Sequence, residues 1–250
     1  MSATCYADLD AAGLNLQAVF ELAELPDELR AGLPEPQDCP PATRLLLVGH
    51  GGRNLWSAVT AAAQGGSDPI DDFSVATVDR WFRVNFPRHR YQLLYPCSGY
   101  VALQDFGRLA GWHHPSPFMV GINNSWGTWF AYRVALLTDA PLEPTARQDG
   151  VVPCERCVSK PCIAACPAGA AAADTFALDR CVTYRQQPES DCAWRCLARL
   201  ACPVGAEHRY DQAQMRHTYA ISLQAIQRYA RGCEHAHGLA GSGRQSSLLR

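Results

Sequence analysis

The stretch Cys154-Glu-Arg-Cys157-Val-Ser-Lys-Pro-Cys162-Ile-Ala-Ala-Cys166-Pro167 places four cysteines within thirteen residues. The gaps between them are two, four and three residues, and a proline directly follows the last cysteine. Thiols so close in sequence converge when the chain folds back on itself in a loop. An iron–sulfur cluster needs such convergence, because cysteine thiolates hold its irons. We therefore expect this stretch to organise the segment around it.

The spacing is close to the bacterial ferredoxin run C-x2-C-x2-C-x3-C-P, although the second gap is two residues longer. In two-cluster ferredoxins the fourth cysteine of this run ligates the other cluster. A second set of cysteines is therefore needed, and the chain supplies it at Cys181, at Cys192-Ala-Trp-Arg-Cys196 and at Cys202-Pro203. Eight cysteines suffice for two [4Fe-4S] clusters.

If the ligands cross over in this way, each cluster takes four cysteines. One set is Cys154, Cys157, Cys162 and Cys202, and the other is Cys166, Cys181, Cys192 and Cys196. Zinc is the alternative metal, but its structural sites usually combine C-x2-C pairs or histidines and lack the cysteine–proline endings. No role is predicted for the remaining cysteines, which are Cys5, Cys39, Cys97 and Cys233.

Disulfides would require an oxidising compartment, and the N-terminal segment offers no route to one. Its first sixteen residues include Asp8 and Asp10 and lack an apolar stretch of secretory length. We therefore expect a cytoplasmic protein with reduced thiols. Charged residues make up 18% of the chain and the net charge is −2, which favours neither a nucleic acid nor an anionic membrane as a partner. No apolar run is long enough to span a bilayer.

The 250 residues divide at the stretch rich in proline and charge that ends near residue 152. We predict a front domain over residues 1–150, a two-cluster module over 151–205, a C-terminal helix over 206–238 and a flexible tail over 239–250. The module has few large apolar side chains, so the clusters are expected to act as its core. The C-terminal helix is amphipathic and should pack back on the front domain.

The front domain alternates strand and helix patterns. Residues 44–48 form a buried strand, followed by a glycine turn at Gly49-His-Gly-Gly52 and a helix over 54–64. The turn is either a plain tight turn or a contact to a phosphate or cofactor. Further expected elements are a strand or helix over residues 14–22, a short helix over 26–33, a helix from Asp68 through Phe82, a strand over 91–95, a helix over 100–109, and a hairpin pairing 118–122 with 128–137.

Several short motifs around the cysteines resemble one protein family. They are Gly111-Trp112, Gly127-Thr-Trp-Phe130, Leu136-Leu-Thr-Asp139 and Asp179-Arg-Cys181-Val-Thr-Tyr. Their order resembles the catalytic half of epoxyqueuosine reductase and its reductive dehalogenase relatives. The second motif also resembles part of the cobalamin-processing protein of animals. The resemblance covers residues 90–205.

This resemblance implies an α+β fold, with a nitroreductase-like mixed sheet and helices, a small bacterial-ferredoxin-like module and a C-terminal helix. It further implies two [4Fe-4S] clusters that pass electrons to a bound cobalamin, with reduced ferredoxin or flavodoxin as the donor. FMN is the alternative cofactor, because a nitroreductase-like domain can also hold a flavin. The substrate would be a small molecule or the corrinoid itself.

The same resemblance suggests the site residues of the front domain. His113, His114 and Asp105 are the catalytic candidates, and the histidines would bind cobalt, protonate a substrate or line the pocket. The cofactor-binding candidates are Trp112, Trp129, Phe130 and Tyr132. Both sets have a plain alternative: adjacent histidines beside prolines are often loop surface, and aromatic residues at strand spacing are often core.

The sequence also departs from the family. Tyr95-Pro-Cys-Ser98 stands where epoxyqueuosine reductase has its proposed proton donor, and the repeat domain that helps to hold transfer RNA is absent. Reduction of a tRNA base is therefore not expected. We predict a corrinoid-linked oxidoreductase. The alternatives are a ferredoxin-like electron carrier or partner-docking protein without its own catalysis, and a redox sensor with a labile cluster.

Overall fold

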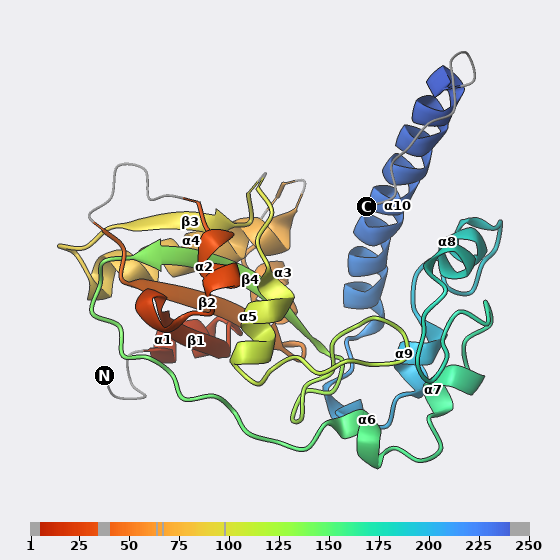
Figure 1. The fold of residues 1–250 in the computed structure, drawn as a ribbon, viewed down its shortest axis with the longest axis horizontal. Coiled ribbons are helices and arrows are strands. Elements are labelled where there is room, and N and C mark those ends of the chain that lie inside the picture. Colours follow the sequence, from red (N-terminus) through yellow and green to blue (C-terminus); the bar gives the residue numbers. More distant parts are fainter. Residues whose placement is uncertain (1–5, 35–40, 64, 67, 98, 241–250) are drawn as a thin grey trace.

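The computed structural model describes residues 6–34, 41–63, 65–66, 68–97 and 99–240, with side chains described as far as residue 227. A sheet domain and a cysteine-rich segment lie at opposite ends of the view in Figure 1. In chain order the elements are α1 (Ala7–Ala11), β1 (Leu16–Glu21), η2 (Leu22–Glu24), α2 (Asp27–Ala31), β2 (Arg44–Gly51), α3 (Asn54–Ala61), α4 (Pro69–Asn85), β3 (Tyr91–Tyr95), α5 (Leu103–Leu109), β4 (Phe130–Thr138), α6 (Pro153–Arg156), α7 (Pro161–Ala164), α8 (Leu178–Gln186), α9 (Leu197–Ala201), η3 (Ala206–His208) and α10 (Gln212–Ala240).

The sheet has the strand order β1-β2-β4-β3, and each neighbouring pair is antiparallel. The predicted mixed sheet is therefore wrong for the strands that the structure describes. β2 and β3 do run in the same direction, because each pairs antiparallel with β4. They are not neighbours, however, because β4 lies between them and pairs antiparallel with both.

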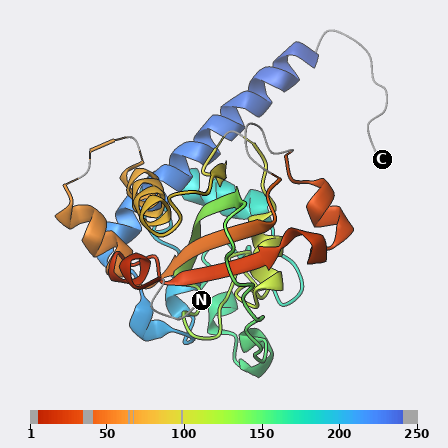
Figure 2. The ribbon, with the colours of Figure 1, turned by 90° about the vertical axis from the view of Figure 1, so that its left-hand side faces the viewer.

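Helices cover both faces of this sheet (Figure 2). The side chains of β2 alternate: Leu46 and Val48 pack with α1, α3 and α4, whereas Leu45 and Leu47 pack with α5 on the opposite face. This two-residue alternation is the normal consequence of strand geometry. Because both faces are covered, β2 reads as a continuous apolar run rather than an alternating one.

The predicted glycine turn after residue 48 is wrong in part. Gly49, His50 and Gly51 continue β2 past a register shift, and the chain turns at Gly52, whose φ is +75°. Glycine suits these strand positions because a Cβ at Gly51 would overlap the indole ring of Trp126. The strand therefore reaches further toward the cysteine-rich segment than the sequence suggests.

The predicted hairpin over residues 118–137 is also wrong. Residues 118–122 form turns with one isolated bridge, between His114 and Ile122, and β4 pairs with β2 and β3 instead. The helix from Asp68 is confirmed: the Asp68 carboxylate accepts a hydrogen bond from the Asp71 amide at 3.2 Å and caps α4. The strand over residues 91–95 and the helices within 26–33 and 100–109 are confirmed as β3, α2 and α5, and residues 16–21 form the strand β1.

The cysteine-rich segment consists of short helices and loops around a small core. Its buried core residues are Phe118, Cys162, Ala171 and Ala198. The predicted C-terminal helix forms as α10, which lies between the sheet domain and α8 in Figure 1. It contacts α8, and His217 packs on Trp56 of α3 with ring centroids 5.0 Å apart. Residues 241–250 of the predicted tail lie outside the described residues. No helix of the described chain is long and apolar enough to cross a membrane.

Candidate iron–sulfur site

Four of the predicted ligands form what we term the first cysteine group: Cys154, Cys157, Cys162 and Cys202. Burial raises the pKa of the Cys154 thiol to about 11, and the charges of Cys202, Cys162 and Cys157 act in the same direction. Such mutual effects require that the thiols lie near one another. α7 begins at Pro161 and carries Cys162, and α9 ends against Cys202, so helix ends position two members of this group.

The other four predicted ligands form the second cysteine group: Cys166, Cys181, Cys192 and Cys196. All four line one cavity of about 360 Å³, whose wall is otherwise mainly apolar and includes Phe118, Phe176, Leu178 and Val182. Burial raises the pKa of the Cys181 thiol to about 11, and the charges of Cys196, Cys166 and Cys192 act in the same direction. The structure thus brings together the same two sets of four that the spacing predicts, although their role as ligands stays a prediction.

The arrangement of the thiols bears on which metal group they could hold. Among the described residues, no three His, Cys, Asp or Glu side chains are grouped so that they could hold a single metal ion. A [4Fe-4S] cluster differs from a single ion, because each of its four irons takes its own thiolate and the ligands stand around a cube. Four thiols around one mainly apolar cavity fit that donor set.

The two extra residues of the long gap form an exposed loop. Val158 is 97% exposed, and Lys160 adopts a left-handed conformation with φ 37° and ψ 58° just before α7. Pro161 follows Lys160 and disfavours a right-handed helical conformation there. The insertion relative to the ferredoxin spacing is therefore taken up at the surface, and Cys157 and Cys162 still reach one group.

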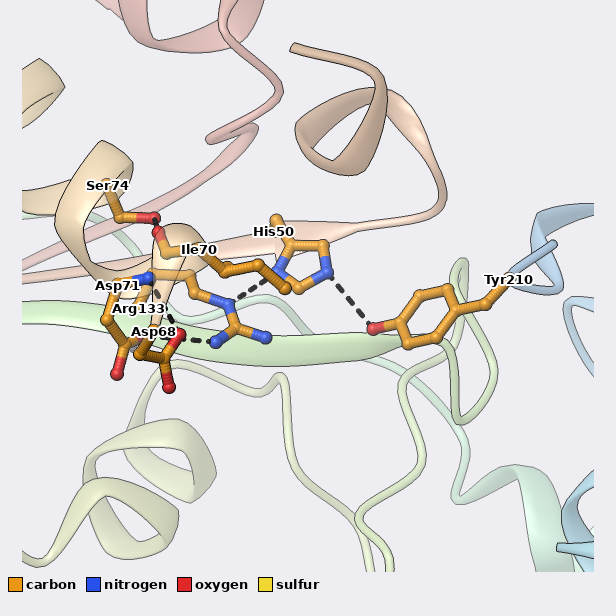
Figure 3. Close-up of polar contacts among 7 residues, drawn as sticks. All are labelled: His50, Asp68, Ile70, Asp71, Ser74, Arg133 and Tyr210. Atoms are coloured by element: carbon orange, nitrogen blue, oxygen red, sulfur yellow. Dashed lines mark hydrogen bonds and ion pairs between the residues drawn. The ribbon is translucent and has the colours of Figure 1, made fainter. Parts of the chain in front are cut away.

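A chain of buried and partly buried polar side chains joins the sheet to the segment that follows the cysteines (Figure 3). Arg133 of β4 donates from Nη1 to Asp71 at 3.2 Å and from Nε to His50 Nδ1 at 3.0 Å. His50 Nδ1 is then an acceptor, so the ring proton lies on Nε2, which is 3.1 Å from the hydroxyl of Tyr210. Burial holds the pKa of His50 well below its ordinary value, assisted by the charges of Arg133 and Arg199. The imidazole is therefore neutral.

The sequence does not indicate these contacts, because it places His50 in a glycine turn and gives no signal for Arg133. The relevant signal is the pairing of β2 with β4, which places His50 opposite Ala131 and brings Arg133 within reach. That pairing depends on residues about eighty positions apart, and short-range patterns do not reveal it.

Of the predicted catalytic residues, Asp105 lies in the first turn of α5, and His113 and His114 lie at the start of the loop that follows it. His113 is 7% exposed, and its Nδ1 lies 3.0 Å from the hydroxyl of Tyr132. Burial lowers the pKa of His113 to about 4, so the ring is neutral at pH 7. His114 is also buried and lies 3.3 Å from the side-chain amide of Asn124. The Asp105 side chain is 44% exposed and pairs with Arg108, and its charge also acts on His113 and Tyr132.

Three of the four predicted cofactor-binding aromatics are packed inside the protein. Trp112 is 1% exposed, Trp129 is 0% exposed and Phe130 is 7% exposed. Trp112 and Phe130 belong to the core beneath α5. Tyr132 is half-buried. These side chains do not offer an open aromatic surface to a corrinoid or flavin, and their role in cofactor binding stays a prediction.

The cysteines outside the two groups are placed only in part. Cys97 is exposed, and its thiol contacts the carbonyl of Leu94. Cys5, Cys39 and the side chain of Cys233 lie outside the described residues. Cys97 is therefore the one clearly described cysteine that belongs to neither group.

Comparison with solved structures identifies relatives of the same fold. An epoxyqueuosine reductase bound to an epoxyqueuosine-modified tRNA stem loop matches with a TM-score of 0.54 and 13% identity, over 85% of this chain and 67% of that one. The Bacillus subtilis epoxyqueuosine reductase matches with a TM-score of 0.53 and 15% identity, over 84% and 66%. A catabolic reductive dehalogenase in complex with 3-bromo-4-hydroxybenzoic acid gives 0.50 and 12%, over 91% and 34%.

These likenesses confirm, at the level of the fold, the resemblance found in the sequence. The chain spans about two thirds of the length of the epoxyqueuosine reductases and about one third of the dehalogenase. No protein-family model matches the sequence, and no curated protein matches it either. At 12–15% identity the comparisons establish the architecture and leave activity to be argued from the site.

Proposed function

We propose that this protein is an iron–sulfur redox protein in which two [4Fe-4S] clusters pass electrons to a corrinoid on the sheet domain, for the reduction of a small substrate. The first cysteine group would hold one cluster and the second group the other. Reduced ferredoxin or flavodoxin would supply the electrons. The observation that carries the proposal is that Cys166, Cys181, Cys192 and Cys196 line one cavity, whereas the charges of Cys157, Cys162 and Cys202 act on Cys154.

The protein's own contribution would be to bind and shield the clusters. The mainly apolar wall around the second group would shield one side of a cluster, and burial is one of the factors that set the reduction potential of a cluster. A backbone amide also donates toward a ligand sulfur, from Arg199 to Cys196 Sγ at 3.4 Å. A bound corrinoid would supply the strongly reducing cobalt centre on which the chemistry depends.

Near the predicted catalytic residues, the protein would offer neutral hydrogen-bonding groups and would not offer a strong acid. His113 is neutral at pH 7 and can accept a hydrogen bond from Tyr132, whose own pKa is raised, mainly by burial. This pair is suited to orienting a bound group through neutral hydrogen bonds. A proton for the substrate would therefore have to come from elsewhere, such as water.

One observation favours a second function, that of an electron carrier without its own catalysis. Trp112, Trp129 and Phe130 are packed in the interior, so a corrinoid would find little open aromatic surface among them. A carrier needs only the clusters and a docking partner. This alternative differs from the main proposal in a single measurable quantity, the cobalt bound per chain.

The test is an elemental count on protein purified without oxygen from a host supplied with cobalamin. About eight irons with stoichiometric cobalt per chain are expected from the main proposal. About eight irons without cobalt would leave the carrier function in place, and a yellow flavin spectrum would indicate FMN instead of a corrinoid. Zinc in place of iron would contradict both functions.

A further inference from the structure

Arg199 of α9 is a buried cation beside the second cysteine group. It is 6% exposed, and its guanidinium lies 4.3 Å from the ring centroid of Trp129 and 4.8 Å from that of Tyr210. It donates to the carbonyl oxygen of Thr128. Its Nε is buried and has no hydrogen-bond partner among the described residues.

Arg185 of α8 is a second buried cation in the same place, at 8% exposure. Its donors bond to the carbonyl of Cys192 at 3.1 Å, the hydroxyl of Ser222 at 3.0 Å and the carbonyl of Tyr219 at 3.2 Å. All three acceptors are neutral. One of them belongs to a member of the second cysteine group.

Neither arginine forms an ion pair with an Asp or Glu of the described residues. Burying a cation without a counter-charge is strongly unfavourable, and arginine cannot lose its proton to avoid this. The ionisable groups near them are the phenols of Tyr210 and Tyr219 and the cysteine thiols, and a thiol ionises more readily than a phenol. Arg199 acts electrostatically on Cys196, and Arg185 acts on Cys181 and Cys192.

A [4Fe-4S] cluster with four thiolates carries a net negative charge, and reduction adds to it. We propose that Arg185 and Arg199 are the counter-cations of the second cluster and raise its reduction potential above that of the first. This inference rests on the proposed function, since it requires both clusters. Net charge and hydrogen bonding near the sulfurs are known determinants of cluster potential.

The first cysteine group lacks an equivalent pair. The cations near it are Lys160, which acts on Cys154, and Arg209, which acts on Cys202. Lys160 is partly exposed, so solvent and salt screen its charge more strongly. Arg209 is partly exposed as a residue, but its Nε is buried without a hydrogen-bond partner among the described residues, and its Nη2 donates to the Cys202 carbonyl at 3.4 Å. The first group therefore has one partly buried cation beside it, against two buried ones beside the second group. An electron that a low-potential donor gives to the first cluster would therefore move to the second. The transfer makes and breaks no bond and needs no proton, because the arginine charge is permanent.

The test is a redox titration followed by electron paramagnetic resonance, on the anaerobic full-length chain with dithionite as reductant. Arg199→Gln and Arg185→Gln should each make the second cluster harder to reduce, by at least tenfold in the equilibrium, or about 59 mV for one electron. The other cluster should keep its potential. Arg199→Lys, which keeps the charge, should stay close to the unaltered chain.

The matched control is Arg195→Gln. Arg195 lines the same cavity but is 49% exposed and pairs with Asp191, so its removal should shift neither potential appreciably. Unchanged potentials in both glutamine variants, with full iron content, would overturn the inference. An equal shift of both clusters would also overturn it. If Arg199→Gln fails to fold, the Arg185→Gln result decides alone.

Iron content separates this inference from the proposed function. If the unaltered chain contains no iron, the proposed function is refuted, and so is the role of the two arginines as counter-cations. A chain with about eight irons and unshifted variants refutes only the role of the two arginines. If Arg199→Gln loses the second cluster whereas Arg199→Lys retains it, the need for a positive charge at this position is supported.

Discussion

Gly107 of α5 lies so close to Tyr132 that a methyl group there would overlap the tyrosine hydroxyl. We predict that Gly107→Ala displaces this hydroxyl from His113 and destabilises the fold by about 1–3 kcal/mol, the usual cost of overpacking. Denaturant unfolding measures the loss. Gly32→Ala is the control, since its Cβ would meet neighbours only at 3.6 Å. Equal losses in the two variants would contradict the geometry of the His113–Tyr132 pair.

The titration of His113 should appear in the pH dependence of stability. Burial lowers its pKa from 6.5 to about 4 in the folded chain. Between these values the unfolded chain binds a proton that the folded chain does not, so stability falls as the pH drops below 6.5. We predict that His113→Gln weakens this fall and leaves the dependence above pH 7 unchanged. Thermal unfolding at several pH values measures both, and parallel curves would contradict the burial of His113.

At the scale of residues, the sequence indicates which cysteines lie near one another, but it does not indicate which charged side chains lie beside them. The two groups of four come from the ferredoxin-like spacing together with the assumption that the fourth cysteine crosses to the other cluster, and their role as ligands stays a prediction. Arg185 and Arg199 give no such signal, since an arginine beside a cysteine motif reads as a surface residue. Their burial depends on Trp129, Tyr210 and Tyr219, which come from other elements.

At the scale of elements, β2 and the chain after η3 are joined by the stacked rings of His50 and Tyr210 and by one hydrogen bond to the Tyr210 hydroxyl. Tyr210 is 5% exposed and bonds to His50. We predict that Tyr210→Phe costs about 1–3 kcal/mol, because it leaves a buried imidazole nitrogen without its partner. The ring contacts with Arg199 and Trp129 would remain. Chemical unfolding of the anaerobic protein measures the cost.

Tyr100→Phe serves as the control for that variant, because Tyr100 is 86% exposed and should change stability by less than about 0.5 kcal/mol. An equally small change in Tyr210→Phe would show that the hydrogen bond to His50 contributes nothing to the contact between these elements.

Local signals predict the start of α4 and the strand β3, because a capping aspartate followed by proline and a bounded apolar run act within a few residues. The extension of β2 through Gly49–Gly51 and the partners of β4 are not predicted. Both depend on pairing between strands distant in sequence. Long-range pairing overrides the local turn preference of glycine and the apparent hairpin around residues 123–127.

At the scale of the whole molecule, the two halves should respond differently to loss of iron. The sheet domain has two extensive apolar cores, whereas the buried core of the cysteine-rich segment is Phe118, Cys162, Ala171 and Ala198. We predict that removing the clusters with a chelator and a mild oxidant abolishes amide protection across residues 153–202 and leaves β2 and β4 protected. Hydrogen exchange measures both regions. Unchanged protection in the cysteine-rich segment would contradict the coupling of metal to folding.

The overall fold can be predicted from the sequence more accurately than the strand pairing or the side-chain packing within it. The resemblance to epoxyqueuosine reductase leads to the correct fold at 13–15% identity, because motifs around the cysteines mark the order of elements. The direction of the strand pairs and the packing of the aromatic side chains cannot be predicted from the sequence. Both depend on the pairing of β4 with β2 and β3, which no short motif indicates.

The iron content of Cys202→Ser, beside that of the unaltered chain, tests the two-cluster assignment most directly. The thiol of Cys202 lies with the first group, although it follows the second group in sequence. We predict a fall from about eight irons to about four per chain, with Cys97→Ser, an exposed cysteine outside both groups, unchanged as the control. Retention of all the iron in Cys202→Ser, or its absence from the unaltered chain, would contradict the assignment.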